Sequence, residues 1–148
     1  MKKANYTPEG YTPLQEKFIN SMMERGKKST ARRILKEAFL ALSEQKQDPE
    51  RIFEKAIENV KPTMEVRPKR IGGAVYQIPV EVKPNRQLAL TFRWIINAAR
   101  ALKGKAMALK LSSVLIEASN GAGPAVKKKE DVHKMAQANK AFAHFAKY

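Results

Sequence analysis

Apolar residues recur three or four positions apart over most of this 148-residue chain, which is the spacing of one face of an α-helix. The clearest run lies between Ala31 and Leu42, where the spacing is kept without exception. Ser29 or Thr30 can cap that helix at its start. We therefore expect six helices, at residues 14–23 before Gly26, 31–42, 49–60 after an N-cap at Asp48, 88–102, 107–118, and from Pro124 to near the C-terminus.

The period changes to two between Thr63 and Lys83, where apolar and polar residues alternate as they do on a β-strand. A break over residues 68–73 separates two alternating runs, which predicts a β-hairpin. Pro68 and Pro79 cannot donate a hydrogen bond to a neighbouring strand, so the hairpin should be an exposed ribbon and not the middle of a sheet. Because a lone two-stranded ribbon is marginally stable in water, we expect its tip to be mobile until a partner binds.

Together these elements predict a mainly α fold, a bundle of about six helices with a protruding two-stranded β-hairpin arm at residues 63–83. The length and the lack of a long linker predict one domain over residues 1–148, with residues 1–13 as a flexible N-terminal extension. No window is apolar enough to span a membrane, and the first residues lack the apolar region of a secretory signal. We expect the protein to work where it is made.

Charge indicates the partner. The chain carries 29 Lys and Arg against 14 Asp and Glu, a net charge of +15, and such an excess repels itself unless a polyanion neutralises it. Residues 61–110 hold 11 basic and 2 acidic side chains, whereas the segments on either side have net charges of only +3 each. Nucleic acid is the expected partner, with an anionic membrane surface as the weaker alternative. Cysteine is absent, which excludes disulfides and thiolate metal sites.

Basic residues gather in four places. Gly26-Lys27-Lys28-Ser29 is similar to the end of a nucleotide-binding loop, but Ser21 stands where such a loop needs its first glycine, which leaves an RNA phosphate contact or a solvated turn. In the hairpin, cations flank two glycines that would let a phosphate chain come close, and Tyr76 could stack on a base. The alternative for the hairpin is an edge ribbon kept soluble by its charges.

The third group is a stripe of arginines spaced by seven, followed by lysines, in a stretch with no acid between Glu81 and Glu117. A solvated helix face usually mixes both signs, so this stripe is more typical of a face that contacts phosphates. The fourth group, Lys127-Lys128-Lys129, is weaker evidence, because Glu130 and Asp131 follow it directly. The candidate RNA-binding residues are Lys27, Lys28, Arg32, Arg33, Arg67, Lys69, Arg70, Gly72, Gly73, Tyr76, Arg86, Arg93, Arg100, Lys103, Lys105, Lys110, Lys127 and Lys128.

Catalysis finds little support in the sequence. His133 and His144 are too far apart on one predicted helix to hold a metal together, and Ser112 and Ser113 lack the glycine-flanked turn of a hydrolase nucleophile. We expect no enzyme activity, no cofactor, no metal and no small-molecule substrate. A DNA-binding helix-turn-helix regulator remains an alternative, because a short turn at Gly26 joins the first two predicted helices.

Several ordered motifs resemble the bacterial-type small-subunit ribosomal protein seven family. They are GKKS at 26–29, ENVKP at 58–62, EVRPKRIGG at 65–73, YQIPVEV at 76–82, RW at 93–94, KKKED at 127–131, HKMA at 133–136 and ANKAFAH at 138–144. Matches so widely separated and in order are more specific than any single motif.

This resemblance implies a structural constituent of the small ribosomal subunit, in a bacterial or an organellar ribosome. It implies a helical bundle with a hairpin arm that binds ribosomal RNA of the head domain and helps to initiate head assembly. It also implies neighbouring ribosomal proteins as partners, with exit-site transfer RNA and the messenger RNA exit path close by. By the same likeness, the turn at residues 26–33, the hairpin and residues 86–110 would meet RNA.

Overall fold

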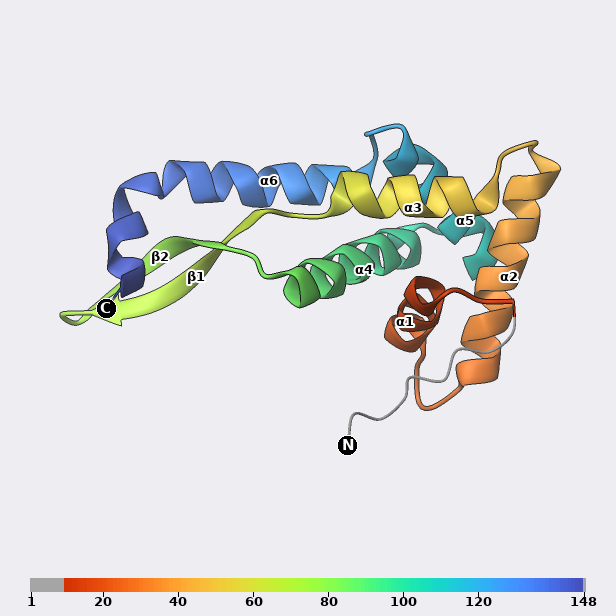
Figure 1. Ribbon diagram of the computed structural model, residues 1–148, viewed down its shortest axis with the longest axis horizontal. Coiled ribbons are helices and arrows are strands. Elements are labelled where there is room, and N and C mark those ends of the chain that lie inside the picture. Colours follow the sequence, from red (N-terminus) through yellow and green to blue (C-terminus); the bar gives the residue numbers. More distant parts are fainter. Residues whose placement is uncertain (1–9, 148) are drawn as a thin grey trace.

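The computed structural model describes residues 10–147, which form helices gathered in a bundle and a hairpin that projects from it (Figure 1). The elements are α1 (Pro13–Met22), α2 (Lys28–Glu44), α3 (Pro49–Val60), β1 (Met64–Ile71), β2 (Ala74–Glu81), α4 (Pro84–Ala101), α5 (Met107–Ser119), α6 (Pro124–Ala138) and the 3-10 helix η1 (Lys140–Lys147). The prediction of a mainly α fold with a two-stranded arm is confirmed.

The core of the bundle forms around α5, which packs against α2, α3, α4 and α6. Leu111 and Leu115 of α5 are fully buried, as the apolar spacing of residues 107–118 predicts. Phe18 of α1 lies at the centre of an aromatic group, with its ring edge-to-face to Phe53 and to Phe92 at centroid distances of 5.3 Å each. The bundle therefore shares one set of buried side chains contributed by all six α-helices.

The N-terminal side of α1 is fixed by a reciprocal cap. The backbone N–H of Gln15 donates to the Thr12 hydroxyl (3.2 Å), and the backbone N–H of Thr12 donates to the Gln15 side chain (3.3 Å). Tyr11 already packs against the edge of the core. Of the predicted flexible extension at residues 1–13, residues 1–9 lie outside the described residues.

The turn between α1 and α2 differs from the prediction. Helix α1 ends at Met22, and Arg25 and Gly26 follow with φ of +53° and +75°, the left-handed conformation that ends the helical path. Helix α2 begins at Lys28 with Lys27 as its N-cap, so the predicted cap at Ser29 or Thr30 is wrong. The side chain of Lys28 binds a carboxylate of α1, which holds this first turn of α2 against α1.

The hairpin is an antiparallel pair with Lys69 opposite Tyr76 and Ile71 opposite Ala74. Gly72 and Gly73 have φ of +56° and +86°, as a two-residue turn between twisted strands requires. The strand β1 continues through Pro68, so the interruption is shorter than the predicted break over residues 68–73. The sheet has only these two strands in the described chain, which confirms that the hairpin is not the middle of a larger sheet. The ribbon is exposed on part of its surface only, because η1 packs on β2 and α6 packs on β1.

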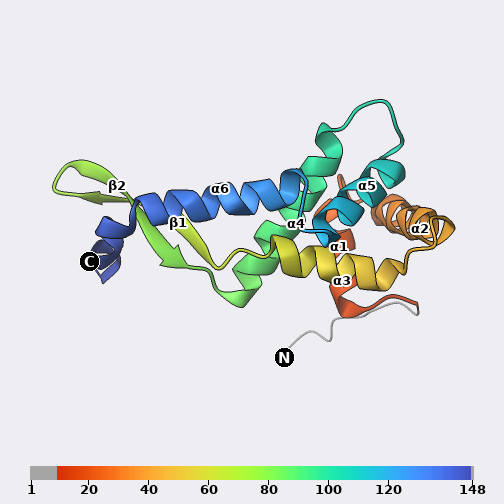
Figure 2. The ribbon, with the colours of Figure 1, turned by 90° about the horizontal axis from the view of Figure 1, so that it is seen from above.

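The C-terminal part departs most from the prediction. Helix α6 ends at Ala138 and does not run to the C-terminus; η1 then turns from the far end of α6 onto β2 (Figures 1 and 2). Met135 is 49% exposed although it is apolar, whereas its neighbour Ala136 is buried. The reason is that α6 reaches beyond the bundle toward the hairpin, so that only a narrow face of its second half is covered.

Candidate nucleic-acid interface

The first group of candidate cations surrounds one buried acid. Glu16 of α1 is 6% exposed and pairs with the Nζ of Lys28 (2.6 Å) and the guanidinium of Arg32 (3.2 Å). The hydrogen bond from Lys28 lowers the pKa of Glu16 below its ordinary value against the opposing effect of burial, and Arg32 adds to the lowering. Glu16 therefore positions two of the predicted cations, while Lys27 and Arg33 are exposed beside them.

The second group runs along α4. Arg86, Arg93 and Arg100 share one face of this helix, and at 1.5 Å per residue the first and last Cα atoms are about 21 Å apart. The opposite face is buried through residues that include Phe92, Ile95 and Ala99. Arg93, at the middle of the stripe, is exposed. Helix α4 thus carries a row of arginines on the face turned away from the core.

At the C-terminal end of α4, the stripe meets the turn between α1 and α2. The guanidinium of Arg100 pairs with the carboxylate of Glu24 (3.0 Å) and donates to the backbone carbonyl of Met22 (3.2 Å). These two bonds bring the cations of residues 27–33 and the end of the arginine row together, although the two segments lie far apart in the sequence.

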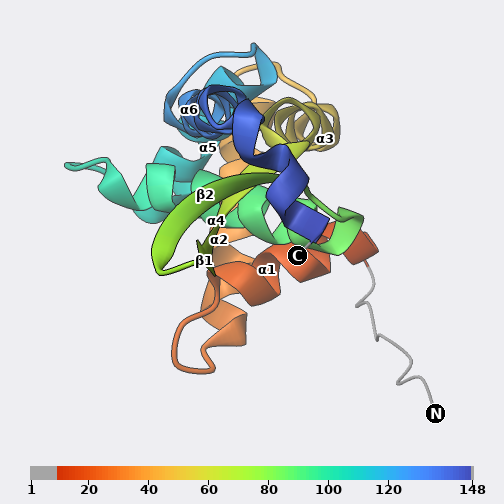
Figure 3. The ribbon, with the colours of Figure 1, turned by 90° about the vertical axis from the view of Figure 1, so that its left-hand side faces the viewer.

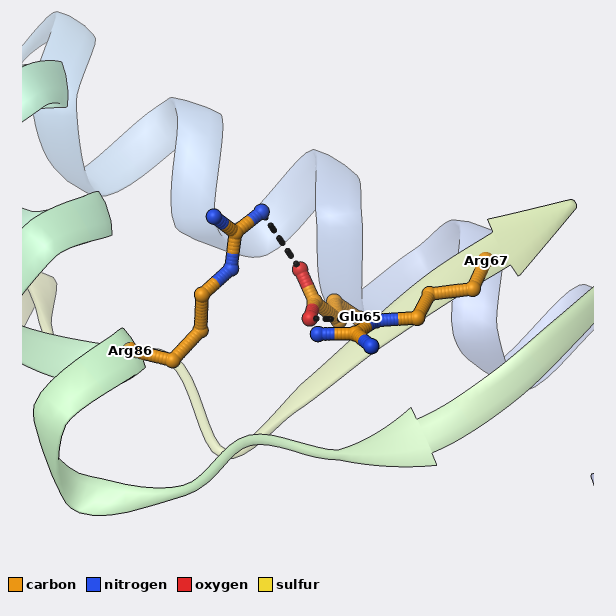
Figure 4. A network of polar contacts seen from close by, with 3 residues as sticks. All are labelled: Glu65, Arg67 and Arg86. Carbon is orange, nitrogen blue, oxygen red and sulfur yellow. Dashed lines mark hydrogen bonds and ion pairs between the residues drawn. The ribbon is translucent and has the colours of Figure 1, made fainter.

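At the N-terminal end of α4, the stripe is tied to the arm (Figure 4). The carboxylate of Glu65 in β1 accepts from the Nε of Arg67 (3.2 Å) and from the Nη2 of Arg86 (3.4 Å), one arginine on each oxygen. Glu65 is 8% exposed although it is charged. Helix α4 therefore links the base of the arm at one end with the turn between α1 and α2 at the other.

Within the arm, the structure gives two candidate residues a contact that the sequence did not indicate. The ring of Tyr76 lies 5.2 Å from that of Phe142 and 5.1 Å from that of Phe145, and the Nζ of Lys69 donates to the carbonyl of Phe145 (3.0 Å). Residues of η1 thus cover one side of the hairpin, which Figure 3 shows from the C-terminal end. Arg70 is exposed near the tip of the arm.

The remaining candidates lie near helix starts. Lys103 and Lys105 are exposed in the loop before α5, Lys110 is half-buried on α5, and Lys127 and Lys128 are exposed on α6. Four helices, α2, α4, α5 and α6, have neither an acid in the first turn nor a side-chain cap bond. Because a helix N-terminus carries partial positive charge, lysines beside it are unfavourable until an anion approaches. These helix starts are electrostatically matched to phosphates.

The described residues hold no group of three or more His, Asp or Glu side chains that could bind a metal. His133 instead accepts a hydrogen bond at Nε2 from the backbone N–H of Thr63 (3.1 Å), which ties α6 to the start of the hairpin. Burial lowers the pKa of His133, and repulsion from Lys129 lowers it further. His144 lies on η1 and not on the same helix as His133, contrary to the prediction. Across the described chain, no helix has the length and apolar character of a membrane span.

Comparison with known proteins identifies the family. A family model described as ribosomal protein S7p/S5e matches residues 2–140, most of the chain. The chain belongs to this family. A curated relative from Solidesulfovibrio magneticus, named small ribosomal subunit protein uS7, is 54% identical over 139 residues, which cover 93% of this chain and 89% of the relative. Proteins of the same name from Chloroflexus aurantiacus and Thermotoga petrophila are 52% and 53% identical, covering 90% and 89% of this chain and 86% of each relative.

Membership of the S7p/S5e family confirms the resemblance found in the sequence motifs. Since this is a family of ribosomal proteins and not of enzymes, the expectation that the chain has no catalytic role is confirmed on that ground. The three relatives are bacterial proteins.

Proposed function

We propose that this chain is a structural constituent of the small ribosomal subunit that binds ribosomal RNA of the head domain. The names of its relatives support a place in the small ribosomal subunit. The observation that carries the RNA contact is the arginine row of α4, joined through Glu65 to the arm and through Arg100 to the turn between α1 and α2. A row of this length, with cations fixed at both ends, suits the phosphates of a folded RNA.

The finer role follows from the family resemblance. The protein binds early and helps to initiate assembly of the head, and its arm lies near exit-site transfer RNA and the messenger RNA exit path. The projection of the hairpin and η1 from the bundle supports this role, because a projecting arm can reach beyond the RNA that the bundle contacts (Figure 1). Neighbouring ribosomal proteins are further partners. The bacterial relatives favour a bacterial ribosome over an organellar one.

The test is the salt dependence of binding to a head-domain fragment of small-subunit ribosomal RNA, with unrelated RNA of equal length and duplex DNA as competitors. Each phosphate contact should steepen the log–log slope by about 0.7 to 0.9. The triple variant Arg67→Ala/Lys69→Ala/Arg70→Ala should lose about two to three phosphate contacts, and the slope should become less steep by the corresponding amount. Circular dichroism should show an unchanged helix content.

A matched control removes the same charge elsewhere. Lys36, Arg51 and Lys55 are exposed, and Arg51 and Lys55 lie on α3 among Glu50, Glu54 and Glu58. Their triple alanine variant should bind nearly as the parent does. Equal losses in the two triple variants would mean that only net charge matters and would refute the arm assignment. Duplex DNA competing as well as the head fragment would instead support the helix-turn-helix alternative.

A further inference from the structure

A cavity of about 180 Å³ lies where the turn between α1 and α2 meets the end of α4 and the start of α5. Residues of α1, α2, α4, α5 and the turn between α1 and α2 line it, and two of the lining residues, Lys27 and Arg100, are candidate RNA-binding residues. The cavity is therefore lined in part by cations that the proposed function assigns to RNA.

The inner wall of the cavity is apolar and rich in methionine. Met22 and Met23 come from the end of α1, Ile34 from α2 and Met107 from the start of α5. The thioether of methionine makes favourable contacts with the edges and faces of aromatic rings and adapts its shape to them. A phosphate would lose its hydration against such a wall without compensation, so the wall favours a flat, uncharged aromatic group.

The rim of the cavity is polar. Lys27 and Thr30 contribute to it, together with the guanidinium of Arg100, which is held by the carboxylate of Glu24 and the carbonyl of Met22. A guanidinium whose plane is held in this way can stack on a base. Lys27 can pair with the phosphate of the same nucleotide, and the Glu24 carboxylate can accept a hydrogen bond from an exocyclic amino group of the base.

We propose that this cavity takes a single unpaired nucleobase of the bound RNA, turned out of its stack. Its volume is below the roughly 300–1,000 Å³ of pockets for drug-sized ligands, which suits one base and not a larger group. The acceptor at Glu24 prefers adenine, cytosine or guanine, which carry an amino group, over uracil. This inference rests on the proposed RNA-binding function, and it adds a point of base recognition to contacts made otherwise with phosphates.

The methyl groups of methionine give a direct test. Met22, Met23 and Met107 line the cavity, whereas Met135 is exposed on α6. In protein with ¹³C-labelled methionine methyl groups, the head-domain RNA fragment should shift the three cavity resonances by ring current and leave that of Met135 nearly in place. Adenosine monophosphate should move the same three weakly, and ribose 5-phosphate should not.

A cavity-filling variant provides the second arm. Thr30→Phe places a ring at the half-buried rim position, and Leu40→Phe places the same ring at an exposed position further along α2, outside the cavity and outside the 26–33 turn. Thr30→Phe should weaken binding of the RNA fragment by about 5- to 30-fold without changing its salt slope. Leu40→Phe should bind as the parent does. If Thr30→Phe disturbs the Met64 and Met135 resonances of the protein without RNA, the smaller substitution Thr30→Leu is used in its place.

The outcomes separate this inference from the proposed function. If the RNA fragment binds with a steep salt slope but the cavity methyl groups do not move, the base pocket is refuted and the RNA-binding role stands. Equal shifts from ribose 5-phosphate and adenosine monophosphate would make the cavity an anion site and would also refute the pocket. A chain that fails to prefer the RNA fragment over duplex DNA would refute the proposed function itself.

Discussion

The contact between η1 and the hairpin should hold the arm in an ordered state. A lone two-stranded hairpin is marginally stable in water, and only the base of this one is buried, through residues such as Ile78. Phe142 packs on Tyr76 at 5.2 Å and on Phe145 at 6.1 Å, and it is half-buried. An aromatic pair contributes about 0.5–1.5 kcal/mol beyond its buried area. Phe142→Ala should therefore destabilise the ordered hairpin, with η1 packed on it, by about 1–2 kcal/mol relative to its locally opened state.

Amide hydrogen exchange measures this effect locally. A loss of about 1–2 kcal/mol multiplies the opening constant by about 5 to 30, and the amides that pair β1 with β2 near Tyr76 should exchange faster by that factor. Amides of α5, in the core of the bundle, should exchange as before, because η1 contacts the hairpin and α6 and not α5. Circular dichroism should change little.

The control is Met135→Ala, which removes a comparably large apolar side chain from an exposed position of α6. It should leave exchange of the hairpin amides unchanged. If Phe142→Ala also leaves hairpin protection unchanged, the arm is ordered by its own strands and by its buried base, and the stabilising role of η1 is refuted. If both variants accelerate exchange in α5, the arm and the bundle open together, which contradicts a locally stabilised arm.

Three further predictions concern the bundle and its polar contacts. Phe18→Ala, which removes the central ring of the aromatic group, should lower the free energy of unfolding by about 3–5 kcal/mol in urea titrations. Because the pKa of Glu16 lies below its ordinary value of 4.5, its stabilising contribution is complete above that pH and is lost on acidification, so the stability difference between the parent and Glu16→Gln should shrink below pH 4.5. Burial lowers the pKa of His133 below 6.5, and protonation at Nε2 would remove the acceptor for the N–H of Thr63. Stability of the parent should therefore fall as the pH drops below about 6.5, and that of His133→Gln should fall less, as followed by thermal melting.

The sequence pattern was sufficient to predict which helices and strands form, but it was insufficient to predict where some of them begin or end. The apolar period of residues 31–42 and the alternation of residues 76–82 identify α2 and β2, because burial of one face imposes these spacings. The end of α6 depends on a contact between segments far apart in the sequence. Phe142 and Phe145 pack against Tyr76 of β2, and the chain leaves the axis of α6 to make this contact. A periodicity read along one segment contains no information about such a partner.

The candidate site shows the same division. A count of charges selects residues 61–110, and the structure places the arginines of α4 on one exposed face. The count treats Glu16 and Glu65 only as neutralising charges, whereas both are buried and each pairs with two cations. Arg67 lies two residues from Glu65, but Lys28, Arg32 and Arg86 lie more than ten residues from the acids with which they pair. Sequence spacing alone does not indicate these distant pairs.

These acids explain how a chain of net charge +15 can hold several of its cations close together without a bound polyanion. Each buried carboxylate offsets repulsion between two basic side chains and fixes where they point. Arg86 uses one of its five N–H donors on Glu65, so other donors remain for a phosphate. In the proposed complex with RNA, the side chains at the two ends of α4 would need little reordering, so little affinity from phosphate contacts would be lost in arranging the cations that make them.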